Sequence, residues 1–284
     1  MSASVVPFPT AKSRAIEPAS PVLKWVGGKR RLLPEIIKRL PDNALAGRYY
    51  EPFLGGAAVF LALQPQSAVL SDLNGELINL YTVVRDNVDA LIADLGKHRY
   101  EKAYFYAVRA QDPRMMTSVE RASRMVFLNR TCFNGLYRVN KRGQFNVPFG
   151  RYSNPTICNP TRLRAAGEAL RGVLLSKSDF LSATETAQAD DFVYFDPPYV
   201  PLSSTANFTA YTKAAFGPTE QGQLADLFAD LTERGVRCMQ SNSDTPLVRE
   251  LYADFDIDVV TTTRPIARDP ESRGPVHEVL IRNY

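Results

Sequence analysis

The sequence has few of the residues that bind metals or build histidine-dependent active sites. Only two histidines occur, His98 and His277, and the three cysteines, Cys132, Cys158 and Cys238, lack the paired spacing of a zinc site. An odd and small number of cysteines also argues against a disulfide framework. We therefore expect a protein of the reducing cytoplasm that has no bound metal.

Long hydrophobic runs are missing as well. No apolar stretch reaches the roughly 18–20 residues that a membrane-spanning helix needs. Residues 1–20 combine prolines, small residues and basic residues without an apolar core, so we expect a flexible tail and not a signal peptide. The 284 residues, 45% of them hydrophobic, suit one large domain or one domain with an insertion.

Acidic residues are scarce in one part of the chain. Residues 97–171 contain 15 Lys and Arg against 4 Asp and Glu, a net charge of +11. The other residues contain 19 basic and 26 acidic side chains, a net charge of −7. Such a local excess is typical of a surface that binds a polyanion, although a solvated basic surface without a partner would give the same count.

The chain is organised around residues 191–199, Asp-Phe-Val-Tyr-Phe-Asp-Pro-Pro-Tyr. The apolar run predicts a strand that is buried on both faces, and the two prolines end it because they have no N–H group. Ligands of open α/β sheets bind where the strands end, so we expect Asp196 and Tyr199 at the mouth of a cleft. There the Asp196 carboxylate and the Pro197 carbonyl could accept from the amino group of a base that stacks on Tyr199. A strand with an ordinary Asp-Pro turn is the alternative.

A first glycine segment lies at residues 27–29. Gly-Gly-Lys lacks the spacing of a phosphate-binding loop, which argues against a nucleotide triphosphatase. Trp25 and Lys29 flank this turn, as an aromatic wall and a partner for a ligand carboxylate would. A helix is expected over residues 32–40.

A second glycine segment lies within residues 48–60, which predict a strand, a glycine turn and a helix. Glycine at this place lets a ligand approach the backbone closely. Residues 67–72 predict the next strand, and Asp72 ends it 17 positions after Gly55. An acid near this offset meets ribose hydroxyls in Rossmann-like folds, while a helix N-cap is the alternative role.

A helical pattern over residues 75–95 precedes the basic region. The basic region predicts a further helix over residues 118–129, followed by a segment that interleaves aromatic residues with arginines. Asn-Gly and Arg-Gly pairs predict hairpin turns in residues 129–152. A hairpin with Phe133, Leu136 and Arg138 at its tip could place a wedge beside a base step and a guanidinium against a guanine. A small packed β-subdomain, with these aromatics as its core, is the alternative.

The strand pattern resumes at residues 173–180, which makes residues 85–160 an insertion between strands of one sheet. This third strand is expected to end on Asp179 and Phe180. The elements expected after residue 199 are a lid loop at 203–217, a helix at 220–234, a strand at 236–242, a helix at 245–252 capped by Asp244, and strands at 257–263 and 276–281 around a loop with Arg264, Arg268 and Arg273.

The order of these motifs resembles one family. The residues that carry the likeness are 24–29 (KWVGGK), 51–56 (EPFLGG), 71–74 (SDLN), 133–136 (FNGL) and 196–199 (DPPY). Together they are similar to the Dam-type, α-group (D12 class) DNA adenine-N6 methyltransferases, over about residues 21–284. The resemblance implies an α/β fold: a Rossmann-like class I methyltransferase sheet with an inserted DNA-recognition domain of helices and a β-hairpin.

The family likeness also implies roles for individual residues. S-adenosyl-L-methionine would be the methyl donor, in a pocket formed by Trp25, Lys29, Phe53, Gly55, Asp72, Asp179, Phe180 and Asp196. The catalytic residues would be Asp196, Pro197 and Tyr199. The residues that contact DNA would be Lys24, Arg130, Phe133, Asn134, Leu136 and Arg138.

The implied reaction is methylation of adenine N6 in double-stranded DNA after base flipping, with GATC as the usual site in relatives that have this hairpin. We expect three parts of the chain: a flexible tail (1–20), a catalytic domain (21–84 and 160–284) and a target-recognition domain (85–159). The protein is expected to be a monomer that associates with the nucleoid through DNA. Ala57 replaces a glycine of many members, and Phe133 replaces a tyrosine of some. An RNA or amide amino-methyltransferase, a silent DNA-binding relative and a restriction enzyme as partner all stay open.

Overall fold

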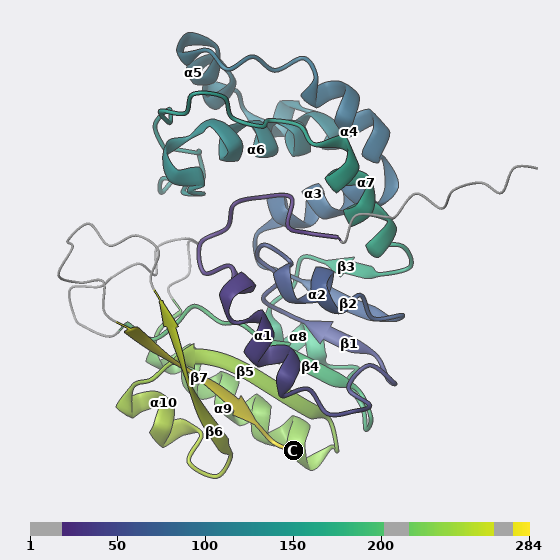
Figure 1. The fold of residues 1–284 in the computed structure, drawn as a ribbon, viewed down its shortest axis with the longest axis vertical. Coiled ribbons are helices and arrows are strands. Elements are labelled where there is room, and N and C mark those ends of the chain that lie inside the picture. Colours follow the sequence, from purple (N-terminus) through teal and green to yellow (C-terminus); the bar gives the residue numbers. More distant parts are fainter. Residues whose placement is uncertain (1–18, 202–215, 264–274) are drawn as a thin grey trace, which may run out of the picture.

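The computed structural model describes residues 19–201, 216–263 and 275–284, and in these residues a seven-stranded sheet forms the centre (Figure 1). The strands are β1 (Tyr49–Glu51), β2 (Ala68–Ser71), β3 (Leu174–Ser176), β4 (Phe192–Phe195), β5 (Arg237–Ser243), β6 (Asp256–Thr263) and β7 (Pro275–Arg282). Their order is β3-β2-β1-β4-β5-β7-β6. The first five are parallel, and β7 lies antiparallel between β5 and β6.

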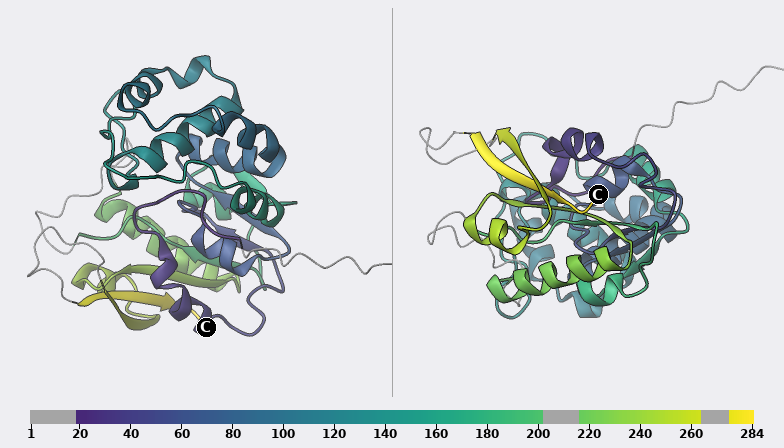
Figure 2. Two further views of the ribbon diagram at one scale, coloured as in Figure 1. Left: turned by 45° about the horizontal axis from the view of Figure 1, so that its top comes forward. Right: turned by 90° about the horizontal axis from the view of Figure 1, so that it is seen from below.

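Helices connect the strands and cover the sheet. They are α1 (Leu33–Lys38), α2 (Ala58–Leu63), α3 (Gly75–Asp86), α4 (Val88–Leu95), α5 (Lys102–Ala110), α6 (Ser118–Thr131), α7 (Pro160–Ala169), α8 (Phe180–Thr184), α9 (Pro218–Glu233) and α10 (Pro246–Leu251). Short 3₁₀ turns lie at Lys29–Arg31, Pro113–Met115 and Phe133–Gly135. Seen from below, α1 and α9 lie on opposite faces of the sheet (Figure 2).

Strand β4 is buried on both faces, as the apolar run predicts. All four of its residues are buried, and they alternate between the two cores of the sheet. Phe192 and Tyr194 belong to a core that includes residues of α1, α2, α3 and α7, and Val193 and Phe195 belong to a core that includes residues of α9 and α10. The prediction of a Rossmann-like sheet centred on this strand is confirmed.

The helices of the basic region lie together beyond the β3 edge of the sheet (Figure 1). They have a core of their own, made of Phe105, Val108, Phe127, Leu128, Cys132, Phe145 and Val147. The long α6 begins with a capping box, in which Thr117 and Glu120 exchange hydrogen bonds. Ala122, Met125 and Val126 of α6 instead belong to the first core of the sheet, so the basic region is joined to the sheet through this helix.

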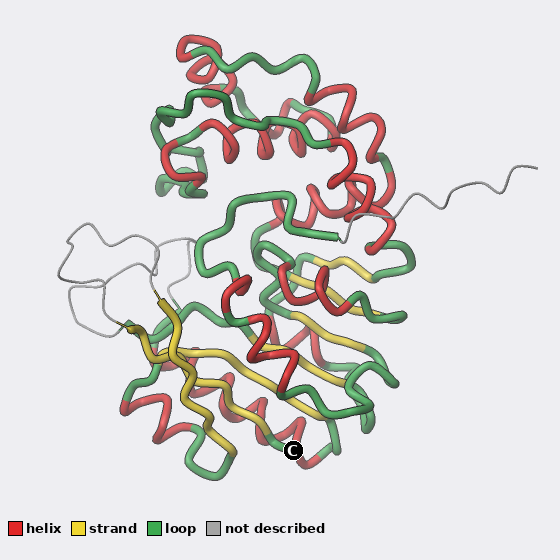
Figure 3. Tube along the Cα trace, viewed as in Figure 1, coloured by secondary structure: helices red, strands yellow, loops and turns green. Residues whose placement is uncertain are grey.

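The predicted β-hairpin at residues 129–152 is wrong in its detail. The segment has a 3₁₀ turn at Phe133–Gly135 and only two isolated bridges, and Figure 3 shows no strand among the upper helices in the described part of the chain. Its tight turn lies at residues 140–144, where the Asn140 side chain accepts from the Arg142 and Gln144 N–H groups. Phe133, Leu136 and Arg138 therefore lie before the tip and not on it.

Three other boundaries differ from the prediction. Strand β3 ends at Ser176, and Asp179 caps α8 by accepting from the Ser182 N–H, so Phe180 begins a helix. Thr245 caps α10, and Asp244 instead pairs with Arg249. The helix expected over residues 75–95 divides at Asn87 into α3 and α4. The expected lid lies outside the described residues up to residue 215, as does the loop with Arg264, Arg268 and Arg273.

Candidate active site

The carboxylate of Asp196 lies directly after β4, at the carboxyl edge of the sheet. Its Oδ1 is 2.5 Å from the Lys29 ammonium and accepts a hydrogen bond of 3.0 Å from the Ser241 hydroxyl. The Asp196 side chain is 20% exposed and that of Lys29 8%, so this is a nearly buried ion pair. Within the described residues, both of these contacts are made by Oδ1.

Tyr199 completes this corner of the site. The Lys29 ammonium lies 4.6 Å from the centroid of the Tyr199 ring, and the Tyr199 hydroxyl donates to Glu278 over 2.8 Å. Lys29 also donates to the Gly27 carbonyl over 2.7 Å. A carboxylate, a cation and an aromatic face therefore meet at the end of β4, where the sequence predicted a site.

Three side chains from β5 and α9 hold the chain between Asp196 and Val200. Gln221 donates to the Pro198 carbonyl over 2.9 Å, and Asn242 accepts from the Val200 N–H. Ser243 donates to the Val200 carbonyl over 2.6 Å, and Asn242 also donates to Gln221. The sequence reasoning missed these residues together with Ser241 and Glu278. The signal available was the polar run Gln-Ser-Asn-Ser inside a strand, which is unusual for a buried position.

Burial dominates the electrostatics of the site. It raises the pKa of Asp196 above its usual range, while the Lys29 ammonium opposes that rise. Glu51, at the end of the neighbouring β1, accepts from the Tyr49 hydroxyl and from the Phe60 N–H. Burial raises the pKa of Glu51 to about 8, so this acid is largely protonated at neutral pH.

The glycine turn after β1 is tied to Asp72 at the end of β2. One Asp72 oxygen accepts from the Gly55 N–H over 3.0 Å and the other from the Asn74 N–H over 2.8 Å. Burial raises the pKa of Asp72, and these two hydrogen bonds lower it. The N-cap of α3 is Asn74 and not Asp72, so the alternative role of Asp72 is excluded.

Trp25 covers the same glycine turn. A Cβ atom at Gly55 or Gly56 would lie 3.0 Å from the Trp25 side chain, so the missing side chains allow this contact. The tryptophan ring packs on Tyr137, with 5.3 Å between ring centroids. Ala57 has φ of 54°, in the left-handed region that favours glycine.

An aromatic cluster lies next to the turn. Phe53 and Phe180 stack with 5.5 Å between centroids, and Phe216 meets Phe53 edge-on at 5.6 Å. The Asp179 side chain is exposed beside Phe180. The structure thus brings the predicted donor-pocket residues to the carboxyl ends of β1, β2, β3 and β4, with Lys29 placed against Asp196.

The predicted DNA-contacting residues come from the segment before the first 3₁₀ turn (Lys24), from α6 (Arg130) and from the segment that follows α6. Lys24 and Asn129 exchange two backbone-to-amide hydrogen bonds of 2.8 Å, and the exposed Lys24 ammonium lies 4.3 Å from the Tyr152 ring centroid. Phe133 is 50% exposed, and Asn134 and Arg138 are exposed beside it. Leu136 differs, because it packs against the core of the insertion.

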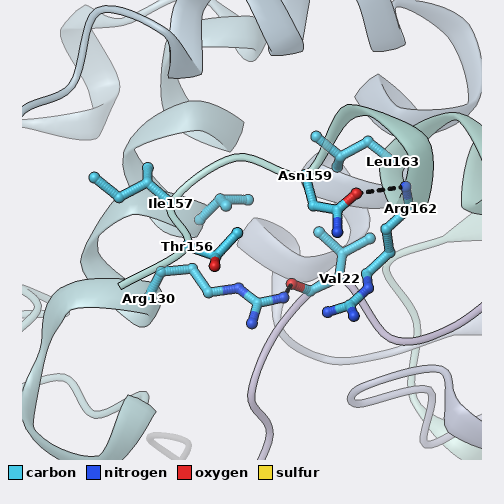
Figure 4. A pocket seen from close by; sticks show the side chains of 8 residues that line it. Val22, Arg130, Thr156, Ile157, Asn159, Arg162 and Leu163 are labelled. Carbon is cyan, nitrogen blue, oxygen red and sulfur yellow. Dashed lines mark hydrogen bonds between the residues drawn. The ribbon is translucent and has the colours of Figure 1, made fainter. Parts of the chain in front are cut away.

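Arg130 lies deeper than the other predicted contacts. Its guanidinium donates to the Val22 carbonyl, and with Arg162 it lines a small cavity under the N-terminal segment (Figure 4). Burial and the nearby Arg162 and Arg30 lower the pKa of Arg130 to about 10. No carboxylate lines this cavity.

Among the residues that the structure describes, no helix combines the length and the apolar composition of a membrane-spanning helix. No group of three or more His, Cys, Asp or Glu side chains in that part of the chain could hold a metal ion.

Comparison with known proteins places these features in a family. Residues 25–266 match the D12 class of N6 adenine-specific DNA methyltransferases. The Type II methyltransferase M1.LlaDCHI of Lactococcus lactis subsp. cremoris is 44% identical over 272 residues, which cover 93% of this chain and 95% of that protein. The DNA adenine methylase of Escherichia coli (strain K12) is 37% identical over 264 residues, covering 91% and 93%. The chain therefore belongs to the D12 class of N6 adenine-specific DNA methyltransferases.

Proposed function

We propose that this enzyme transfers a methyl group from S-adenosyl-L-methionine to N6 of an adenine within GATC, after flipping that adenine out of the DNA duplex. The family accounts for adenine-specific DNA methylation. The observation that carries the rest is the placement of Asp196 and Tyr199 together at the carboxyl edge of β4. The Asp196 carboxylate can accept a hydrogen bond from an amino group, and the base that carries this amino group can stack on the Tyr199 ring.

The residues around the glycine turn fit a nucleoside-like donor. Each Asp72 oxygen accepts one backbone N–H, and a carboxylate has about four lone-pair sites, so Asp72 can still accept from ribose hydroxyls. Phe53 and Phe180 offer aromatic faces to a base, and the exposed Asp179 can accept from its amino group. When bound, S-adenosyl-L-methionine supplies an electrophilic methyl group on a sulfonium.

Access to N6 requires the adenine to leave the stack, because the duplex hides the amino group. This costs a few kcal/mol, and the half-exposed Phe133 ring is suited to fill the vacated space. Lys24, Asn134 and Arg138 are exposed as well. We assign DNA contacts to these three residues and to Arg130.

Catalysis then depends on positioning and charge. Asp196 and the Pro197 carbonyl accept from the amino group while the Tyr199 ring stacks on the base. Positive charge grows on the amino nitrogen as it attacks the methyl group, and the Asp196 carboxylate stabilises that charge. No residue of the chain has to form a covalent bond with the substrate.

We assign residues 21–84 and 160–284 to catalysis and residues 85–159 to target recognition. This division is supported by the apolar cluster that α5, α6 and the segment after α6 form apart from the two cores of the sheet. We further propose that one copy of the chain suffices, which sedimentation of the enzyme with and without a duplex would test.

A plasmid assay tests the proposal. Plasmid DNA from a host without adenine methylation is incubated with the enzyme and S-adenosyl-L-methionine, then cut with nucleases that GATC methylation blocks or requires. Protection at GATC is expected, and methylation mapped to a different sequence would replace that site. Methyl transfer to RNA in preference to duplex DNA would overturn the substrate, and absence of binding in a calorimetric titration would overturn the cofactor.

A further inference from the structure

Lys29 is a buried cation in contact with the proposed catalytic groups. Its ammonium lies 2.5 Å from Asp196 Oδ1, 2.7 Å from the Gly27 carbonyl and 4.6 Å from the Tyr199 ring centroid. A carboxylate, a backbone carbonyl and the face of Tyr199 are also the partners that the proposed function gives to the adenine amino group. The ammonium therefore makes the kinds of contact that the substrate would make.

The charges of the free enzyme explain why a cation lies there. A nearly buried carboxylate without a partner is costly, and burial already raises the pKa of Asp196. The ammonium offsets part of this cost and opposes the rise in the pKa of Asp196. Ser241 also donates to Oδ1, but it brings no charge.

During methyl transfer the same cation is a disadvantage. Positive charge grows on the amino nitrogen, and a carboxylate that an ammonium already neutralises attracts this charge less. Two cations close to one carboxylate also repel each other. The arrangement thus suits an enzyme without its target base better than it suits the transition state.

We propose that the Lys29 ammonium is a placeholder, which occupies the amino-group subsite of Asp196 and Tyr199 until the flipped adenine displaces it. Lys29 follows two exposed glycines, Gly27 and Gly28, so solvent lies close to the place it leaves. The inference rests on the proposed function, because the adenine amino group is the displacing ligand.

The experiment measures how much the amino group adds to binding. Two duplexes are compared in the presence of S-adenosylhomocysteine, which allows no turnover: one with adenine at the methylated position and one with purine, which lacks the amino group. The sequence is the one that the wild-type enzyme methylates. The preference for adenine is the Kd of the purine duplex divided by the Kd of the adenine duplex. In the wild-type enzyme this preference is expected to be small, because the amino group must displace the ammonium.

Substitution of Lys29 removes this competition. Lys29→Met is expected to raise the preference for adenine over purine by roughly tenfold, the value of one charge-assisted hydrogen bond. Lys29→Gln keeps an N–H donor without the charge and should give an intermediate ratio, and it serves if the methionine variant does not fold. Lys38→Met, at an exposed lysine of α1, is the matched control and should leave the ratio unchanged.

Each outcome has a defined meaning. An unchanged or smaller ratio in folded Lys29→Met or Lys29→Gln enzyme overturns the placeholder, because Lys29 would then not compete with the amino group. If wild-type enzyme methylates no adenine in any duplex, the proposed function fails instead. The two failures are thus distinguished by the behaviour of the wild-type enzyme.

Discussion

Substitution of Asp196 by alanine tests the centre of the site. It removes the carboxylate that is proposed to accept from the target amino group, and it leaves the exposed Phe133 and Arg138 in place. One preorganised electrostatic group contributes about 10²–10³ to turnover, so we expect Asp196→Ala to lose at least about 10²-fold of its methyl transfer. Affinity for duplex DNA should be largely kept. Tritiated methyl incorporation measures the first quantity, and fluorescence anisotropy of a labelled duplex the second.

The same substitution has a structural cost that can be worked out. Lys29, whose side chain is 8% exposed, loses the carboxylate 2.5 Å away. Removing one partner of a buried ion pair costs about 3–5 kcal/mol, and the 20% exposure of Asp196 argues for the lower end, about 3 kcal/mol. At roughly 2 °C per kcal/mol for a chain of this size, Tm should fall by about 6 °C.

A second variant separates stability from catalysis. Asp196→Ala combined with Lys29→Met removes the unpaired ammonium, so it should recover most of the lost Tm and none of the activity. Full methyl transfer by Asp196→Ala would refute the role of Asp196. A double variant that melts no higher than Asp196→Ala would refute the claim that the buried cation needs this carboxylate.

Three further predictions concern other parts of the molecule. Arg138→Ala should relax discrimination at one guanine by about 1–3 kcal/mol, measured with single-base variants of the site; equal weakening on all sequences would make Arg138 a phosphate contact. Because folding raises the pKa of Glu51 from 4.5 to about 8, its contribution to the free energy of unfolding is full below pH 4.5 and lost as the pH rises through about 8. Glu51→Gln should remove this fall of roughly a few kcal/mol in urea denaturation, and an unchanged pH dependence would contradict the assignment. Tyr199→Phe keeps the ring and loses the hydrogen bond to Glu278, so methyl transfer should fall far less than in Tyr199→Ala; equal losses would show that the hydroxyl matters more than stacking.

Local sequence patterns were sufficient to predict the parallel part of the sheet. The run Phe192–Phe195 could be recognised as a central strand because both of its faces are apolar, and the prolines after Asp196 mark its end. The spacing from Gly55 to Asp72 likewise reflects a local strand-helix-strand unit. Such features depend on neighbours in the sequence, and this is why they can be read from it.

Other features depend on contacts between distant segments. The hairpin at residues 129–152 was predicted from its turn residues, but the segment packs its aromatics against α5 and α6 and forms only two bridges. Similarly, no local pattern shows that Lys29 reaches Asp196, which lies 167 positions later in the chain. The sequence could therefore name most residues of the site without showing which of them touch.

The geometry of the active site is a property of the sheet order and not of the Asp-Pro-Pro-Tyr motif alone. The prolines restrict the backbone, but Ser241, on β5, positions the Asp196 carboxylate, and Glu278, on β7, holds the Tyr199 hydroxyl. In the register of these two strands, Ser243 lies opposite Glu278. Since β7 pairs antiparallel with β5 and carries Glu278, the orientation of the Tyr199 ring depends on a strand far from the motif in the sequence. The motif supplies the chemical groups, and the insertion of β7 between β5 and β6 orients them.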